Sequence, residues 1–170
     1  MGTCPGGHLD AARPRPDARR PEVAALWYKL PGVIEFAGEH GARALAHLRQ
    51  DPVVWLTTVS PAGAPLPMPV WFVFDGQESL LIYSINGARV RNVAANPLVA
   101  LSFPSDPEGT DVVVFAGEAR IDPDSPPAHR NAAYLEKYEQ RIGGLEMTPA
   151  SFAETYDTPI RIRLTRLRGQ

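Results

Sequence analysis

The sequence predicts a mainly β, α+β fold, in which a six-stranded β-barrel carries flanking helices. Six short runs are rich in β-branched and other apolar residues, and several are apolar at both even and odd positions. Strands of that kind are buried on both faces, which favours a closed or packed barrel over a one-sided sheet. The length of 170 residues, 44% of them hydrophobic, suits one domain and is too short for two full cores.

The predicted strands are bounded by turn-forming pairs such as Asp75-Gly76 and Asn96-Pro97. Short turns separate the first three strands, which are therefore expected to form a meander. Gly117 marks a predicted bulge in the fifth strand, and the alternation of the sixth strand changes phase at Leu167. The six strands are expected over residues 53–60, 66–75, 79–85, 99–103, 111–121 and 159–168.

Apolar residues at helical spacing predict four helices around these strands. The third of them presents Tyr134, Tyr138 and Ile142 on one face, and Thr148 is the predicted N-cap of the fourth. The four helices are expected over residues 34–50, 87–95, 126–142 and 149–156.

Residues 1–22 are expected to be a disordered tail, and residues 23–170 the folded domain. The tail is rich in proline, glycine and arginine, and Leu9 is its only large apolar side chain. It has almost nothing to bury, so its deletion should leave folding and ligand binding unchanged.

Composition narrows the class of protein. The net charge of −2 gives no overall field for holding nucleic acid or an anionic membrane. No apolar run approaches the roughly 20 residues of a membrane span, and the start of the chain lacks the apolar core of a signal peptide. Cys4 is the only cysteine, so no internal disulfide or thiolate metal cage can form. A cytoplasmic protein without nucleic-acid or membrane partners is expected.

The motifs of common enzyme sites are absent from the sequence. It has no GxGxxG, no phosphate-binding GxxxxGK loop, no GxSxG and no HExxH. His40 and His47 are seven residues apart on one helix, which suits a surface or dimer-face position better than a metal site because no trio of carboxylates lies nearby. Asp122 and Asp124 lie in a proline-rich loop and are expected to be solvated. No catalytic side chain is indicated, so a cofactor is expected to carry any reaction.

Two arginines suggest an anion-binding site. Arg89 and Arg91 fall in the first turn of the predicted helix over 87–95, where positive charge opposes the helix dipole. A bound anion would reverse that effect, since it would contact both the arginines and the free backbone N–H groups. Ser84 and Asn86 would add donors. Alternatively, both arginines point into water or meet the acids around Asp106.

Residues 56–103 resemble the pyridoxamine 5′-phosphate oxidase family, whose members are flavin-binding split barrels. The matching pieces are LTTVSPAGAP, PVWFVFDG and LIYSINGARVRNVAANPLVALSFP, and they occur in the order of the family. The similarity extends over roughly residues 40–121, with the last strand TPIRIRLTRLRG included. Within the family, the chain is most similar to the actinobacterial branch of deazaflavin- or flavin-dependent reductases.

The resemblance implies a set of cofactor-binding residues. It assigns the cofactor phosphate to Arg89, with Arg91 and Ser84 as neighbours, and Tyr83 is a candidate proton donor. True oxidases carry an arginine and a lysine where this chain has Met68 and Val73, so coenzyme F420 is favoured over tightly held FMN. The full set of implied cofactor-binding residues is Thr57, Thr58, Met68, Pro69, Val70, Trp71, Tyr83, Ser84, Arg89 and Arg91.

The resulting hypothesis is an F420-dependent oxidoreductase that moves a hydride to a small unsaturated organic substrate. The resemblance implies a homodimer with the cofactor at the subunit interface, where Trp71, Tyr134 and Tyr138 would shape the partner's pocket. Trp71, Phe72 and Phe74 are expected to be exposed and to supply the apolar interface. The alternatives are an FMN-binding oxidase or flavin reductase of the same fold, and a non-catalytic cofactor- or haem-binding relative. The last alternative is a nucleic-acid binder that uses the arginines of the sixth strand.

Overall fold

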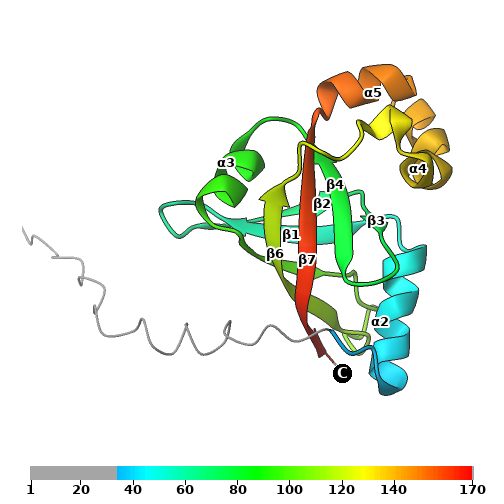
Figure 1. Cartoon of the computed structure of the whole chain (residues 1–170). Helices are drawn as coiled ribbons and strands as arrows, with labels where there is room; N and C mark the ends of the chain where they lie inside the picture. The colour runs from blue at the N-terminus through cyan, green and yellow to red at the C-terminus, as the bar shows by residue number, and fades with distance from the viewer. Residues whose placement is uncertain (1–33, 170) are drawn as a thin grey trace, which may run out of the picture. The chain divides into compact units, whose positions relative to one another are not determined.

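The fold is a curled sheet of seven antiparallel strands, in the order β2-β1-β5-β6-β7-β4-β3 (Figure 1). The computed structural model describes residues 34–169, so the predicted tail over residues 1–22 lies outside the described residues. The strands are β1 (Val54–Val59), β2 (Pro65–Val70), β3 (Val73–Phe74), β4 (Ser79–Ser84), β5 (Leu98–Ser102), β6 (Val113–Ile121) and β7 (Thr158–Gly169). The helices are α2 (Gly38–Gln50), α3 (Ala88–Ala95), α4 (Ala132–Gly144) and α5 (Pro149–Thr155), with a 3₁₀ turn η1 (Ala128–Arg130).

The predicted second strand is two strands in the structure. β2 pairs with β1 at one edge of the sheet and β3 pairs with β4 at the other, so the chain must bend between them at Trp71 and Phe72. This bend accounts for seven strands where the sequence predicts six. It also corrects the expected exposure, because Phe72 is fully buried and Trp71 and Phe74 are half-buried.

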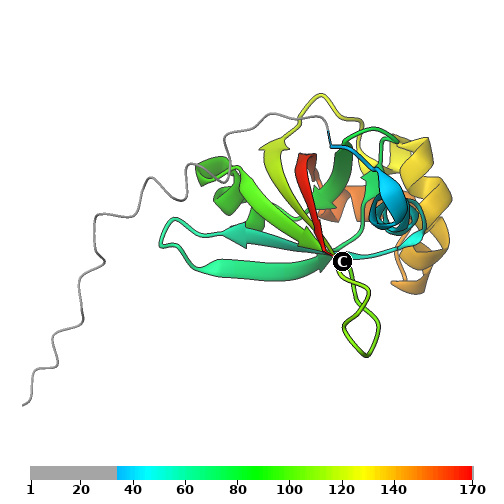
Figure 2. The ribbon, with the colours of Figure 1, turned by 90° about the horizontal axis from the view of Figure 1, so that it is seen from below.

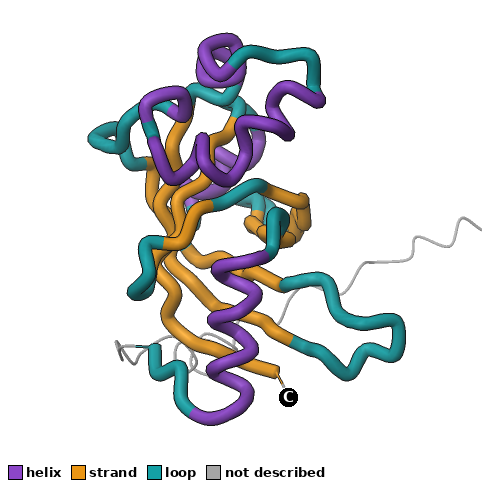
Figure 3. The backbone as a smooth tube through the Cα atoms, turned by 90° about the vertical axis from the view of Figure 1, so that its right-hand side faces the viewer, coloured by secondary structure: helices purple, strands orange, loops and turns teal. Residues whose placement is uncertain are grey.

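Two apolar cores lie on the two faces of β4. Leu80 and Ile82 point into the barrel, where they join residues of the other strands and of α2. Leu81 and Tyr83 point the other way, into a second core formed with α4 and α5. Figure 2 shows the strands curling around the interior, and Figure 3 shows α4 and α5 together at one end of the sheet. The apolar residues at the even and odd positions of β4 therefore each pack into one of the two cores.

The helix that supplies most of the second core packs as the sequence predicts, but it begins at Ala132 and not at Pro126, because Ala128–Arg130 form the separate turn η1. The Asn131 side chain caps α4 by accepting a hydrogen bond from the Tyr134 backbone N–H at 3.1 Å. Tyr134, Tyr138 and Ile142 are buried on one face. The predicted N-cap of α5 is confirmed, since Thr148 and Ser151 form a reciprocal capping box.

The predicted bulge is confirmed, and it explains the change of phase in the last strand. Ala116 pairs with Arg166 while the next residue, Gly117, pairs with Leu164, so Thr165 is the extra residue. A Cβ on Gly117 would lie 2.9 Å from the Arg163 carbonyl oxygen, which is closer than a side chain tolerates. The strands thus approach closely where the bulge shifts the inward-facing position from Leu164 to Leu167.

The prediction that Asp122 is solvated is wrong. Its carboxylate is buried and accepts hydrogen bonds from Arg120 Nη1, Arg161 Nε and Ser125 Oγ, each at 2.7 Å. Arg120 and Arg161 occupy directly opposite positions on β6 and β7, where like charges repel. Burial alone would raise the pKa of Asp122, but these hydrogen bonds and the two guanidinium charges outweigh it and lower the pKa. The Asp122 carboxylate therefore offsets the repulsion between Arg120 and Arg161.

Candidate functional site

A pocket of about 550 Å³ lies between the bend after β2, the end of β4, the start of α3 and the cap formed by α4 and α5. Most of its walls are apolar or aromatic. We call it the Arg89 pocket, after the only arginine or lysine among the described residues that line it. Its lining comprises Leu66, Met68, Pro69, Val70, Trp71, Tyr83, Ser84, Ile85, Gly87, Ala88, Arg89, Tyr134, Leu145, Phe152 and Tyr156.

Arg89 is a half-buried cation without an acidic partner. Its Nη1 donates to Ser84 Oγ at 3.0 Å, and Ser84 Oγ in turn donates to the Ile85 carbonyl oxygen at 3.0 Å. Within residues 34–169, no carboxylate forms an ion pair with its guanidinium. Burial lowers the pKa of Arg89, yet an arginine remains charged at neutral pH. The alternative of pairing with Asp106 does not occur, because that side chain caps its own loop at Thr110 and Asp111.

The start of α3 adds to the positive character beside Arg89. Its N-cap, Gly87, has no side chain to cap the helix, and the first turn contains no acidic residue. Gly87 and Ala88 line the pocket, so the first turn of the helix opens onto it. An anion placed there could accept hydrogen bonds from backbone N–H groups and from the guanidinium together.

Tyr83 contributes its ring to the pocket wall, and its hydroxyl is already hydrogen-bonded. The hydroxyl donates to the Pro126 carbonyl oxygen at 2.7 Å and accepts from Asn131 Nδ2 at 3.1 Å. Burial raises the pKa of Tyr83. Both observations argue against Tyr83 as a ready proton donor, and they give it a structural role between β4 and the start of α4.

The structure brings seven of the ten predicted residues together in the Arg89 pocket. These are Met68, Pro69, Val70, Trp71, Tyr83, Ser84 and Arg89. The other three lie elsewhere: Thr58 is buried and accepts a hydrogen bond from Asn92 Nδ2 at 3.0 Å, Thr57 points to the opposite face of β1, and Arg91 is exposed. Arg89 and Arg91 therefore differ as two residues should that lie two positions apart on a helix and so point about 200° away from each other.

Sequence reasoning missed the far wall of the pocket. Leu145, Phe152 and Tyr156 come from the region of α4 and α5, about 70 residues after the strands that they face. The only signal for this wall in the sequence was the buried face of α4, because it contains Tyr134, which lines the pocket of its own chain. Trp71 stacks on Tyr138 with ring centroids 4.9 Å apart, so Tyr138 supports the wall from behind.

The two histidines of α2 have separate surroundings. His47 lies between two carboxylates, with Nδ1 2.7 Å from Asp51 Oδ2 and Nε2 3.0 Å from Asp111 Oδ2. His40 instead contacts Arg43, whose Nη2 lies 3.3 Å from His40 Nδ1. Across the part of the chain that the structure describes, no group of three or more His, Cys, Asp or Glu side chains is arranged to hold a metal ion.

Comparison with known proteins identifies relatives of this chain. A sequence model of the family described as pyridoxamine 5′-phosphate oxidase matches residues 41–168. The chain is similar to the structure of an F420 reductase, with 27% identity, a TM-score of 0.57, and coverage of 74% of this chain and 96% of that chain. Among the curated proteins, none matches.

Two further solved structures share the fold. A protein of Listeria innocua is 21% identical with a TM-score of 0.55, over 75% of this chain and 94% of its own. A conserved hypothetical protein of Mycobacterium tuberculosis is 20% identical with a TM-score of 0.58, over 80% of this chain and 84% of its own.

Within residues 34–169, no helix combines the length and the hydropathy needed to cross a bilayer.

Proposed function

The chain belongs to the pyridoxamine 5′-phosphate oxidase family, and we propose on that basis that it is an oxidoreductase that binds coenzyme F420 and moves a hydride between this cofactor and a small unsaturated organic substrate. One observation carries the proposal. Arg89, half-buried and without an acidic partner, stands at an uncapped helix start where a large apolar pocket opens. A site of this kind suits a ligand with a phosphate at one end and a planar ring system at the other.

The residues of the pocket fit the two parts of such a cofactor. Arg89, Ser84 and the first turn of α3 would hold the phosphate, and residues Met68–Trp71 would lie along the ring. A bound deazaflavin supplies the hydride chemistry, which no side chain of the pocket could perform. The apolar walls from α4 and α5 would exclude water from the reacting atoms.

F420 is favoured over FMN by the charge of the pocket. Arg89 is its only cation among the described residues, and Met68 presents an apolar side chain where the resemblance places a basic one in the oxidases. A single cation suits a cofactor that is held loosely by its phosphate and exchanges between enzymes. The similarity to an F420 reductase at 27% identity supports the same choice.

The test is a binding titration of the purified full-length protein with F420 and, separately, with FMN. We expect F420 to bind, and the reduced cofactor to be oxidised when an unsaturated acceptor is added. Arg89→Met should weaken F420 binding roughly 10- to 150-fold, because a hydrogen bond to a charged group contributes about 1.5–3 kcal/mol. Arg91→Met is the matched control, since Arg91 lies on the same helix but is exposed, and it should bind F420 as the parent does.

Each outcome of the titration supports or contradicts one part of the proposal. Tight binding of FMN with no affinity for F420 would replace the proposed cofactor and keep the fold-level assignment. A Soret band in the purified protein would instead indicate haem binding. Binding of neither F420 nor FMN, or equal affinity of the Arg89→Met and Arg91→Met variants, would remove the basis of the proposal.

We further propose that the protein works as a homodimer with the pocket near the interface. β2 is an edge strand whose side chains are exposed from Pro65 through Pro69, which is unusual for apolar residues. Met68 on this strand and Trp55 on the neighbouring β1 are each 43% exposed. A dimer that covers them should bury more than about 2,000 Å² in total. Sedimentation of a stable 18.5 kDa monomer at micromolar concentration would refute this.

A further inference from the structure

The bend between β2 and β3 is held by two side chains of α4. The Tyr138 hydroxyl accepts a hydrogen bond from the Phe72 backbone N–H at 2.9 Å, and its proton is directed at the carbonyl oxygens of Phe72 (2.8 Å) and Pro52 (2.9 Å). Lys137 Nζ donates to the same Phe72 carbonyl oxygen at 3.1 Å. Both backbone polar groups of Phe72 are therefore bound to one helix, although Phe72 itself belongs to the barrel core.

This contact fixes the neighbouring residue, Trp71, in the wall of the Arg89 pocket. The indole stacks on the Tyr138 ring with an interplanar angle of 2°, and it also stacks on Phe152 at 5.7 Å between centroids. Phe72 and Trp71 point to opposite sides of the bend, the first into the barrel and the second into the pocket. A rotation of the backbone at Phe72 would therefore move the Trp71 ring.

Lys137 lies in an unusual environment for an ammonium group. Its Nζ sits 3.8 Å from the centroid of the Phe72 ring and is half-buried, and no ion pair to it occurs in the described part of the chain. Burial lowers the pKa of Lys137 to about 8, against a partial opposing effect of the Asp51 charge. The Phe72 carbonyl oxygen and the face of the Phe72 ring hold the ammonium there, and both contacts are stronger for a protonated amine than for a neutral one.

We propose that Lys137 and Tyr138 are positioning residues, which hold the backbone of Phe72 and so fix Trp71 in the pocket wall. Only the cofactor-binding part of the test rests on the proposed function. The position of Trp71 can be measured without any ligand.

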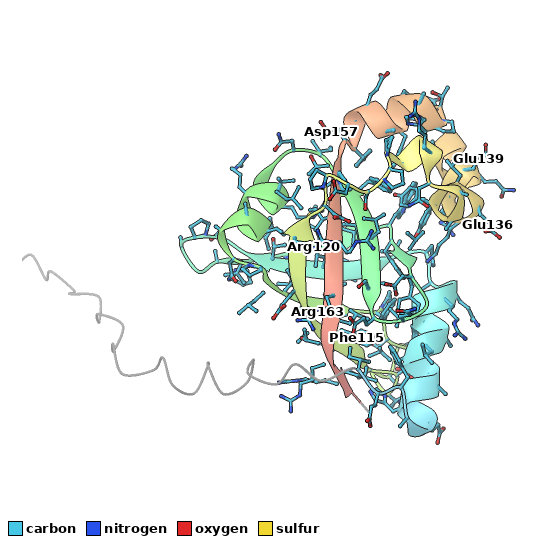
Figure 4. All side chains as sticks on the ribbon, viewed as in Figure 1. Phe115, Arg120, Glu136, Glu139, Asp157 and Arg163 are labelled. Atoms are coloured by element: carbon cyan, nitrogen blue, oxygen red, sulfur yellow. The ribbon has the colours of Figure 1, made fainter. Side chains whose placement is uncertain are left out.

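The first test measures how accessible Trp71 is to acrylamide in the ligand-free protein. The background carries Trp55→Phe and Trp27→Phe, so that Trp71 is the only indole. We expect Lys137→Met to raise the quenching of Trp71, because it removes the hydrogen bond to the Phe72 carbonyl oxygen. Lys137→Arg keeps a charged donor at this position and should raise the quenching less. Glu139→Gln is the control, since Glu139 lies on the outer side of the same helix (Figure 4), and it should be quenched as the parent is.

The second test measures affinity for F420 in the same variants. Tyr138→Phe keeps the ring that stacks on Trp71 but removes the hydroxyl, and it should raise the quenching of Trp71 and weaken F420 binding roughly three- to tenfold. Parent-like quenching in Lys137→Met would overturn the role of Lys137. Parent-like quenching and affinity in Tyr138→Phe would overturn that of Tyr138.

The two tests separate this proposal from the proposed function. If neither F420 nor FMN binds the parent protein, the proposed function fails while the quenching of Trp71 still decides the positioning role. If Tyr138→Phe does not fold, the two lysine variants decide it through the quenching of Trp71 alone.

Discussion

Replacing Asp122 by asparagine should destabilise the protein more than its place in a proline-rich loop suggests. The carboxylate is buried, with a side chain 5% exposed, and it neutralises Arg120 and Arg161, which face each other across β6 and β7. Asparagine keeps an acceptor oxygen for one arginine but removes the charge that both require. The variant would thus leave two opposed cations with no buried anion between them.

The size of the loss follows from the exposure of the partners. Removing one member of a fully buried ion pair costs about 3–5 kcal/mol. Arg120 is 63% exposed and Arg161 32% exposed, so water would stabilise part of their charge in the variant. We therefore expect a loss of about 2–3 kcal/mol in the free energy of unfolding, which lowers Tm by roughly 4–12 °C in a chain of this size.

The assay is urea unfolding at pH 7, with Glu118→Gln as the matched control. Glu118 pairs with Arg163 on the same two strands at 2.7 Å, but both side chains are well exposed, so its loss should cost no more than about 1 kcal/mol. Adding Arg120→Gln to the Asp122→Asn variant should restore part of the stability, because it removes the repulsion. Equal losses in Asp122→Asn and Glu118→Gln would refute the reasoning.

The Asp122 carboxylate also predicts how the stability of the protein changes at acidic pH. The pKa of Asp122 is lower in the folded protein than its ordinary 3.8, so its stabilising contribution is fully present above that value and is lost as the pH falls through the lowered pKa. The parent should therefore lose stability below about pH 4 more steeply than the Asp122→Asn variant.

Two other positions give independent tests. Burial would lower the pKa of His47, but its hydrogen bonds to Asp51 and Asp111 and their charges raise it, so its contribution is fully present below pH 6.5 and is lost as the pH rises through the raised pKa. His47→Gln should cost about 1–2 kcal/mol at pH 6 and less at pH 9, as measured by urea unfolding. Gly117→Ala should cost about 1–3 kcal/mol, because the new Cβ would meet the Arg163 carbonyl oxygen, and thermal unfolding would show it. A neutral result at either position would contradict the contacts described.

Local patterns in the sequence were sufficient for most elements. Helix α4 follows from the spacing of Tyr134, Tyr138 and Ile142, and the start of α5 follows from Thr148, because both signals act within one or two turns. The bend at Trp71 and Phe72 could not be predicted. Residues 66–74 form an unbroken apolar run, and its division depends on which strands pair at distant edges of the sheet.

Outside the secondary structure too, some features could be predicted from the local sequence, whereas others depend on residues that are distant in the chain. Arg89 was identifiable because a cation at a helix start conflicts with the dipole, which is a purely local effect. The burial of Asp122 was not, since it depends on Arg161, 39 residues later in the chain. The aromatic wall from α5 likewise depends on how the helices pack on β4, and no spacing within either segment encodes it.

The bend after β2 has a consequence for the way the sheet is closed. β2 and β3 are the first and last strands of the sheet, yet only Trp71 and Phe72 separate them along the chain. The ring of strands is therefore completed by covalent bonds and not by a ladder of hydrogen bonds. A circular permutant with its new ends at this dipeptide would keep every strand pair intact while freeing the two edges to separate. The Trp71-Phe72 dipeptide therefore limits how far the two edge strands can separate at this point.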